Sequence, residues 1–154
     1  MADQQELLSD EGMREFIRKG FISFETDMPG LHVTVFKRTV ESMEMSGNPG
    51  NNIMAVIPEL HQVLDHPKVT GTLSSILGAG YHLNAHRYLH RRPLGPETQA
   101  HLHKDGNGKG PRTRWCMAFY YPQDTTVALG PTNVVPGSQY YNHEPDAEVG
   151  EETP

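Results

Sequence analysis

The sequence predicts an α+β fold in which N-terminal helices precede a jelly-roll-like pair of sheets. In the first half of the chain, apolar residues recur at helical spacing, and short alternating stretches separated by turn residues follow. Glycine and proline are frequent, at 15 and 12 of the 154 residues, which is typical of a chain with many turns. This length suits one domain with one core.

Four helices are expected, because each stretch combines helical apolar spacing with a start or stop signal. Ser9 is a suitable N-cap for the first helix, and Gly20 closes it. Pro58 and Pro67 stand at the first position of the last two helices, where proline is favoured. The expected ranges are 10–19, 31–45, 58–64 and 67–77. The apolar face expected for the second helix consists of Val33, Phe36, Val40 and Met43.

Short strands are expected where apolar and polar residues alternate, or where β-branched and aromatic residues gather between turn residues. The stretch with the strongest strand character is 114–121, which is rich in aromatic residues and ends at Pro122. Residues 144–154 are acidic and poor in apolar side chains, so a loop or a disordered tail is expected there. The expected strands are 21–25, 81–90, 99–105, 114–121 and 132–135.

Three histidines, His82, His86 and His90, are spaced by four residues. On a helix they would form a stacked metal-binding face. The surrounding alternation, with Gly80 before it and Pro93 after it, favours a strand instead. In a strand, residues four apart are about 13 Å apart, too far to share one metal ion. These histidines are therefore expected to line one polar face.

The charge distribution bears on the expected partners. The net charge is 13 − 19 = −6, which argues against nucleic acid as a partner. Seven of the thirteen basic residues nevertheless fall within residues 87–114, which favours a small-molecule substrate that is anionic. Solvated loops are the plain alternative for this basic window.

Other features of the composition bear on the compartment. Cys116 is the only cysteine, which excludes a disulfide framework and a cysteine-based zinc site and suits a reducing compartment. The first ten residues do not resemble a signal or transit peptide. No apolar run approaches the length of a membrane span, so no membrane partner is expected. A cytoplasmic protein is expected from these observations.

The triplet His103-Lys104-Asp105 carries the chemistry predicted for this chain. Side chains two residues apart in a strand point to the same face, so His103, Asp105 and the preceding His101 would project together. A histidine and a carboxylate so placed supply two ligands of the 2-His-1-carboxylate set, which leaves open positions on Fe(II). A polar strand end with a solvated aspartate is the alternative.

The triplet together with later segments resembles the phytanoyl-CoA dioxygenase family of Fe(II)/2-oxoglutarate oxygenases. About thirty residues after the triplet, residues 130–138 read Gly-Pro-Thr-Asn-Val-Val-Pro-Gly-Ser, similar to the family's GPL-x-V-x-PGSH segment. The opening residues 8–22 and the aromatic stretch 115–121 also match the family pattern. The resemblance spans roughly residues 8 to 141.

This resemblance implies a double-stranded β-helix, cupin-like in form, with Fe(II) at its mouth. It implies that His103 and Asp105 bind the metal and that Phe119 and Tyr121 contact the cosubstrate 2-oxoglutarate. His101 lies one step outside the motif, and it either stands beside the metal ligands or has no role in the site. The implied reaction oxidises a small organic or acyl substrate while 2-oxoglutarate is decarboxylated to succinate. Residues 1–143 would then form a single oxygenase-like domain.

The chain departs from the family pattern after residue 114. The family has a third histidine ligand and a 2-oxoglutarate-binding arginine on later strands. Here, His143 is the one histidine after Asp105, and no arginine follows Arg114. Gln139 stands where the family has the histidine of PGSH. We therefore expect the front portion of a longer protein, with an incomplete β-helix that is inactive alone. The alternatives are a non-catalytic jelly-roll module that binds ligands or partners, and zinc binding by the histidine-rich region.

Overall fold

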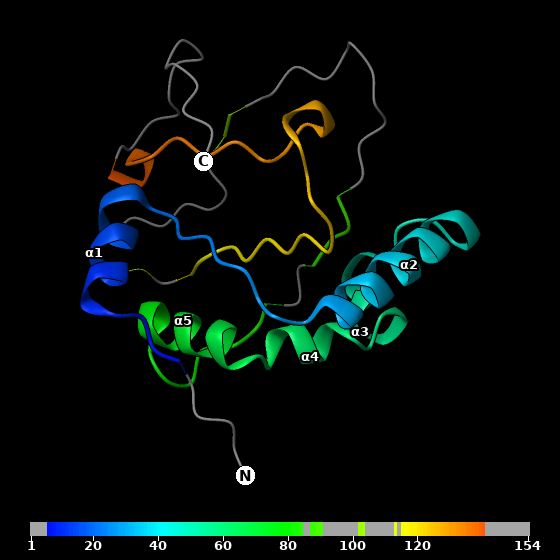
Figure 1. The fold of residues 1–154 in the computed structure, drawn as a ribbon, viewed down its shortest axis with the longest axis horizontal. Helices are drawn as coiled ribbons and strands as arrows, with labels where there is room; N and C mark the ends of the chain where they lie inside the picture. Colours follow the sequence, from blue (N-terminus) through cyan, green and yellow to red (C-terminus); the bar gives the residue numbers. More distant parts are fainter. Residues whose placement is uncertain (1–5, 85–86, 91–101, 104–112, 114, 141–154) are drawn as a thin grey trace.

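The computed structural model describes residues 6–84, 87–90, 102–103, 113 and 115–140 (Figure 1). Helices account for 50 % of these residues. The α-helices are α1 (Asp10–Lys19), α2 (Pro29–Met45), α3 (Ile53–Val56), α4 (Leu60–Leu64) and α5 (Pro67–Leu77). The 3-10 helices are η1 (Gly50–Asn52), η2 (Val127–Leu129) and η3 (Ser138–Tyr140). In Figure 1, α3, α4 and α5 follow one another as a row of helices.

Helix α1 begins and ends at the residues that its capping signals predict. The Ser9 hydroxyl accepts a hydrogen bond from the backbone N–H of Gly12 at 3.1 Å. Gly20 takes a left-handed conformation, with φ of +84°, and its N–H donates to the Phe16 carbonyl. A residue with a Cβ is disfavoured in this conformation, which is why a glycine ends the helix. The predicted range 10–19 is confirmed.

Helix α2 confirms the helix predicted for 31–45, but its buried face is not the predicted one. Val35 is 2 % exposed and packs with Ile53 of α3 and with Ile57. By contrast, Val33 is 53 % exposed and Phe36 is 37 % exposed. Helical spacing indicated that apolar side chains share a face, but two stripes were available on this helix. The stripe through Val35 is the one that contacts α3.

Helix α4 begins two residues later than predicted. The sequence placed Pro58 at the first helical position, whereas Pro58 and Glu59 form a turn and the helix begins at Leu60. This turn is closed by the Leu60 N–H, which donates to the Ile57 carbonyl at 3.1 Å. Val63 is the buried residue of α4.

Helix α5 is confirmed as predicted, from Pro67 at its first position to Gly78 after its end. The segment before α1 crosses this helix closely. The Glu6 N–H donates to the Pro67 carbonyl at 3.1 Å, and the Leu8 N–H donates to the Ser75 hydroxyl at 3.0 Å. The crossing point lies over Gly71, which has no side chain to obstruct the passing backbone.

The last described segment extends away from the helices and then returns to α1. Residues 115–121 run in non-helical conformation between the row of helices and the segment that carries η2 (Figure 1). The Tyr121 hydroxyl donates to the Thr132 hydroxyl at 2.6 Å, which joins the outgoing and returning chain. The return ends at η3, beside the C-terminal end of α1 (Figure 1).

The predicted α+β fold, with N-terminal helices packed on a double-stranded β-helix, is wrong for the described part of the chain. Half of those residues are helical, and among them there is no strand, sheet or barrel. Segments 21–25, 81–84, 87–90, 115–121 and 132–135, where strands were predicted, are non-helical but not paired into a sheet. Alternation is a local property of the sequence, whereas a strand also needs a neighbouring backbone that completes its ladder of hydrogen bonds. In the predicted strand 99–105, only residues 102 and 103 are described.

Two further observations concern the ends of the chain and membranes. The tail predicted for 144–154, and with it the boundary of the 1–143 domain, lies outside the described residues. Among the helices that the structure describes, none is both long and apolar enough to cross a membrane.

Candidate functional site

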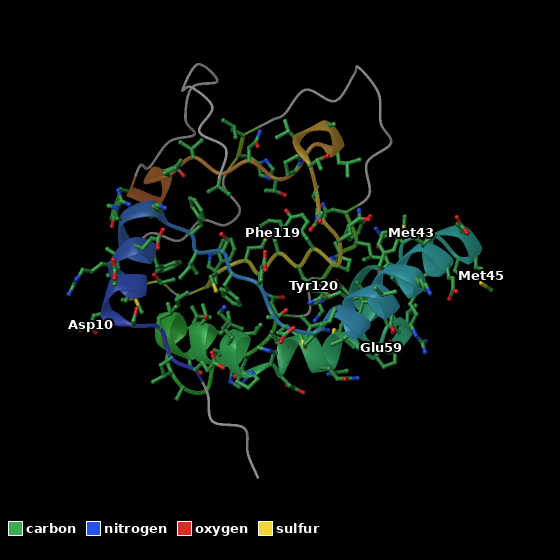
Figure 2. The ribbon with its side chains drawn as sticks, viewed as in Figure 1. Asp10, Met43, Met45, Glu59, Phe119 and Tyr120 are labelled. Carbon is green, nitrogen blue, oxygen red and sulfur yellow. The ribbon has the colours of Figure 1, made fainter. Side chains whose placement is uncertain are left out.

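Phe119 and Tyr121, the predicted cosubstrate contacts, are two residues apart in the non-helical segment 115–121, so an extended backbone places their side chains on the same side. Phe119 is 50 % exposed and Tyr121 is 46 % exposed, and Trp115 and Met117 on the same side are each 43 % exposed. We call these four side chains the outward face. Between them, Tyr120 is half-buried, and Figure 2 shows Phe119 and Tyr120 on opposite sides of the segment.

Tyr120 holds the opposite side of this segment against the helices. Its hydroxyl lies 2.7 Å from Nδ1 of His32 in α2, and the two rings are tilted with centroids 5.7 Å apart. Nε2 of His32 lies 3.0 Å from the Thr26 carbonyl oxygen, which only accepts hydrogen bonds. Nε2 therefore carries the proton, and the Tyr120 hydroxyl donates to Nδ1.

The burial of Tyr120 also changes its acid–base chemistry. Its ring packs against the apolar cluster of Val35, Ile53 and Ile57. Removal of the phenol from water disfavours the phenolate and raises the pKa of Tyr120 to about 12. The neighbouring Cys116 is half-buried, and burial likewise raises the pKa of its thiol. A thiol with a raised pKa is a poor nucleophile at neutral pH, which makes Cys116 an unsuitable catalytic residue.

The structure brings Tyr121 together with the second half of the sequence motif. The 2.6 Å hydrogen bond from its hydroxyl to Thr132 joins segment 115–121 to the run at 130–138. Thr132 is the third residue of that run. A pair of hydroxyl groups thus lies at one end of the outward face, and Trp115, Met117 and Phe119 make the rest of it apolar.

The predicted metal ligands are only partly described. His103 is exposed, and Asp105, His101 and the later His143 lie outside the described residues. Among the residues that are described, no three His, Cys, Asp or Glu side chains gather closely enough to hold a metal ion. An imidazole and a carboxylate are donors that suit Fe(II), but they provide two of the three protein ligands that such a site uses. The described residues thus do not assemble a complete iron site.

Gln139, at the position of the family's PGSH histidine, has a structural role in this chain. Its Nε2 donates to the Ile17 carbonyl in the last turn of α1 at 2.8 Å. The Tyr140 hydroxyl donates to the same carbonyl, and the Gly137 N–H donates to the Lys19 carbonyl at 2.8 Å. The last carbonyls of a helix have no partner within the helix, so residues 137–140 satisfy them from outside.

An open hollow among the described residues is separate from these positions. It has a volume of about 380 Å³ and lies between the C-terminal half of α2 and the η1–α3 turn. At its edge Arg38 pairs with Glu59, with 2.8 Å between Nε and Oε1. None of the predicted site residues lines it. The lining residues are Arg38, Glu41, Ser42, Met45, Ser46, Gly47, Pro49, Asn52 and Val56.

Sequence reasoning did not find the pairing of His32 with Tyr120. The two residues are 88 positions apart, and His32 lies outside the segments that carry the resemblance to the family. The available signal was the strand predicted for 114–121, in which Tyr120 would face away from Phe119 and Tyr121. It did not indicate what Tyr120 would face.

Comparison of this chain with protein-family models, with curated proteins and with solved structures gives no match. The resemblance to phytanoyl-CoA dioxygenases therefore rests on the sequence motifs alone.

Proposed function

We propose that this chain belongs to an Fe(II)- and 2-oxoglutarate-dependent dioxygenase of the phytanoyl-CoA dioxygenase type. The observation that carries the proposal is the triplet His103-Lys104-Asp105 followed by the run at 130–138. The hydrogen bond between Tyr121 and Thr132 supports it, because it brings an expected cosubstrate contact to that run.

In this proposal His103 and Asp105 donate an imidazole nitrogen and a carboxylate oxygen to Fe(II). When bound, Fe(II) and 2-oxoglutarate supply the oxidising chemistry, in which O2 oxidises the substrate and 2-oxoglutarate is converted to succinate and CO2. Phe119 and Tyr121 contact 2-oxoglutarate, and the apolar part of the outward face keeps water from it. A small, anionic substrate suits the basic residues between 87 and 114.

Metal binding to the 154-residue chain tests this proposal without requiring turnover. Co(II), which does not react with O2 as Fe(II) does, is titrated with and without 2-oxoglutarate, and its visible absorption is followed. We expect a saturable signal that 2-oxoglutarate changes, and at least about a tenfold weaker affinity in His103→Ala, because a ligand is lost. Asp105→Ala is expected to weaken binding similarly.

His61→Ala is the matched control, since His61 is an exposed histidine of α4 outside the motif. It is expected to bind Co(II) as the unaltered chain does, and far-UV circular dichroism checks that all variants keep their helices. Equal Co(II) affinity in His103→Ala, Asp105→Ala and His61→Ala would overturn the proposal, as would the absence of any Co(II) signal.

A non-catalytic binding module is the second candidate function. It is favoured by the outward face, where four large apolar or aromatic side chains are exposed together. The Co(II) titration distinguishes the two candidates. A chain that keeps its helices and binds no metal through His103 would support the module and not the dioxygenase.

A further inference from the structure

We propose that His32 and Tyr120 form a positioning pair that determines which side of segment 115–121 is the outward face. His32 is then a positioning residue for Phe119 and Tyr121, although it lies in another element. The part of this inference that concerns 2-oxoglutarate rests on the proposed function. The part that concerns the orientation of the segment rests on geometry alone.

The hydrogen bonds of His32 give the pair a defined direction. Its ring is held on one side by Thr26, whose carbonyl and hydroxyl oxygens lie 3.0 and 3.3 Å from Nε2. The other ring nitrogen is thereby left as an acceptor, and the Tyr120 hydroxyl fills that position at 2.7 Å. A histidine fixed at one nitrogen presents its second nitrogen in one direction, so it selects one placement of the tyrosine.

The packing of the Tyr120 ring favours the same placement of this side chain. The Tyr120 ring contacts the cluster of Val35, Ile53 and Ile57, in which Ile57 is fully buried. Successive side chains of an extended chain point to opposite sides, so a slip by one residue would exchange the two sides of the segment. Phe119 or Tyr121 would then enter the helices, and Tyr120 would be exposed. A Phe119 side chain in that place has no hydroxyl to give to His32, so the hydrogen bond to His32 opposes that slip. A Tyr121 side chain in that place could donate to His32 but would lose its own hydrogen bond to Thr132.

Tyr121 is held on the opposite side by its hydrogen bond to Thr132. Two consecutive tyrosines therefore bind partners in opposite directions, one in α2 and one in the run at 130–138. Because the backbone is held on both sides, the outward face is fixed. The orientation of Phe119, which directly precedes Tyr120, is then fixed as well. His32 is thus a remote determinant of the expected cosubstrate contacts.

The orientation can be measured through Trp115, because it is the only tryptophan of the chain and belongs to the outward face. The anchor is removed by Tyr120→Phe, which keeps the ring, and separately by His32→Leu. Both changes are expected to alter the emission maximum of Trp115 and its quenching by acrylamide, with the helical circular dichroism kept.

Matched controls are Tyr88→Phe and His61→Leu, which change an exposed tyrosine and an exposed histidine elsewhere. Neither control is expected to change the Trp115 signal. If the two anchor variants behave as the two controls do, the positioning role is refuted. Tyr120→Phe removes only a hydroxyl, so we expect this variant to fold. The comparison can therefore be made even if His32→Leu does not fold.

A rescue experiment separates positioning from general stability. His32→Asn keeps a hydrogen-bond acceptor near the place of Nδ1, so we expect it to restore the Trp115 signal that His32→Leu loses. In the double variant Tyr120→Phe/His32→Leu, the effects should not add, because both changes remove one hydrogen bond. Fully additive effects, or no difference between Asn and Leu, would count against the pair.

The consequence for 2-oxoglutarate is tested by its affinity for the Co(II)-loaded chain. Tyr120→Phe is expected to weaken 2-oxoglutarate binding by about fivefold, the effect of one hydrogen bond, and to leave Co(II) affinity unchanged. An unchanged 2-oxoglutarate affinity would overturn the inference for the cosubstrate. If the unaltered chain binds no 2-oxoglutarate, the proposed function fails, and the Trp115 experiment still decides the orientation.

Discussion

At the scale of single residues, the partial burial of Tyr120 changes the acid–base behaviour of its phenol. The pKa of its phenol is about 12 in the folded chain because the group is partly removed from water. The unfolded chain exposes the phenol, which then ionises near its ordinary value of 10.0. Ionisation therefore favours the unfolded state once the pH exceeds that ordinary value.

We predict from this difference that Tyr120 contributes stability that is fully present below pH 10 and is lost as the pH rises toward 12. The measurement is urea unfolding at a series of alkaline pH values, for the unaltered chain and for Tyr120→Phe. The difference between their free energies of unfolding should shrink over this range. A Tyr88→Phe variant, altered at an exposed tyrosine, should show no such trend, and a constant difference for Tyr120→Phe would contradict the prediction.

The ion pair of Arg38 with Glu59 leads to a second prediction at this scale. Glu59 has a side chain that is 16 % exposed, and its Oε2 is buried with no hydrogen-bond partner among the described residues. Arg38→Met would leave this carboxylate without its cation, so we predict a loss of about 1–2 kcal/mol in the free energy of unfolding. Arg14→Met, at an exposed arginine of α1, should cost less.

The double variant Arg38→Met/Glu59→Leu completes the comparison for this ion pair. It removes both charges and should recover most of the loss, because no carboxylate is then left largely buried without a cation. Chemical denaturation of Arg38→Met, Glu59→Leu and the double variant measures the three free energies of unfolding. A double variant less stable than Arg38→Met would show that the pair itself stabilises the fold.

At the scale of elements, the helices could be predicted because their signals are local. Ser9 and Gly20 are adjacent to the turns that they cap, and Pro67 and Gly78 bound α5 in the same way. The face of α2 could not be predicted, since its burial depends on where α3 lies. The strands failed for a related reason. The aromatic residues of 115–121 indicated an extended backbone, but a sheet also needs a partner strand from elsewhere in the chain.

The contact of residues 6–8 with α5 leads us to predict that a Gly→Ala substitution in this helix destabilises the protein. Gly→Ala in a helix interior ordinarily stabilises a protein by about 1 kcal/mol. At Gly71 an added Cβ would meet the Glu6 backbone, with the Glu6 nitrogen at 2.8 Å and the carbonyl closer still. Backbone cannot give way as a flexible side chain can. We therefore predict that Gly71→Ala lowers the free energy of unfolding by about 2 kcal/mol.

Gly30→Ala is the control for this substitution, because Gly30 is also helical and a Cβ there would meet nothing within 4 Å. It should be neutral or stabilising in thermal unfolding. Hydrogen exchange of the Glu6 and Leu8 amides gives an independent measurement, since both donate hydrogen bonds to α5. Unchanged protection of these amides in Gly71→Ala would contradict the predicted clash.

At the scale of the whole molecule, few apolar side chains are buried and many are exposed. The buried apolar residues of the described part are Val35, Ile53, Ile57, Val63 and Leu73. A core of this size leaves much of the cohesion between distant segments to individual hydrogen bonds. The candidate site is affected in the same way, because segment 115–121 is joined to α2 by His32 and to the run at 130–138 by Thr132. Neither link could be deduced from the sequence, because a local pattern does not show which side chains of separate segments will meet.

The link between α1 and residues 137–140 allows this view of the molecule to be tested. Gln139 and Tyr140 donate to the Ile17 carbonyl across 122 and 123 positions of sequence. Each hydrogen bond is expected to contribute about 1 kcal/mol. We predict that Gln139→Ala/Tyr140→Phe loses about 2 kcal/mol and that the last turn of α1 frays, which hydrogen exchange at the Gly20 amide would detect.

Gln123→Ala/Tyr88→Phe changes the same residue types at exposed positions and should leave both measurements unaltered. The unwinding should stop at α1, because α5 has its own cap at His66 and its own buried residues. If Gln139→Ala/Tyr140→Phe instead exposes the amides of α5 as well, α1 and α5 unfold together. In that case the hydrogen bonds of Gln139 and Tyr140 stabilise the molecule as one cooperative unit, and the local account of α1 is wrong.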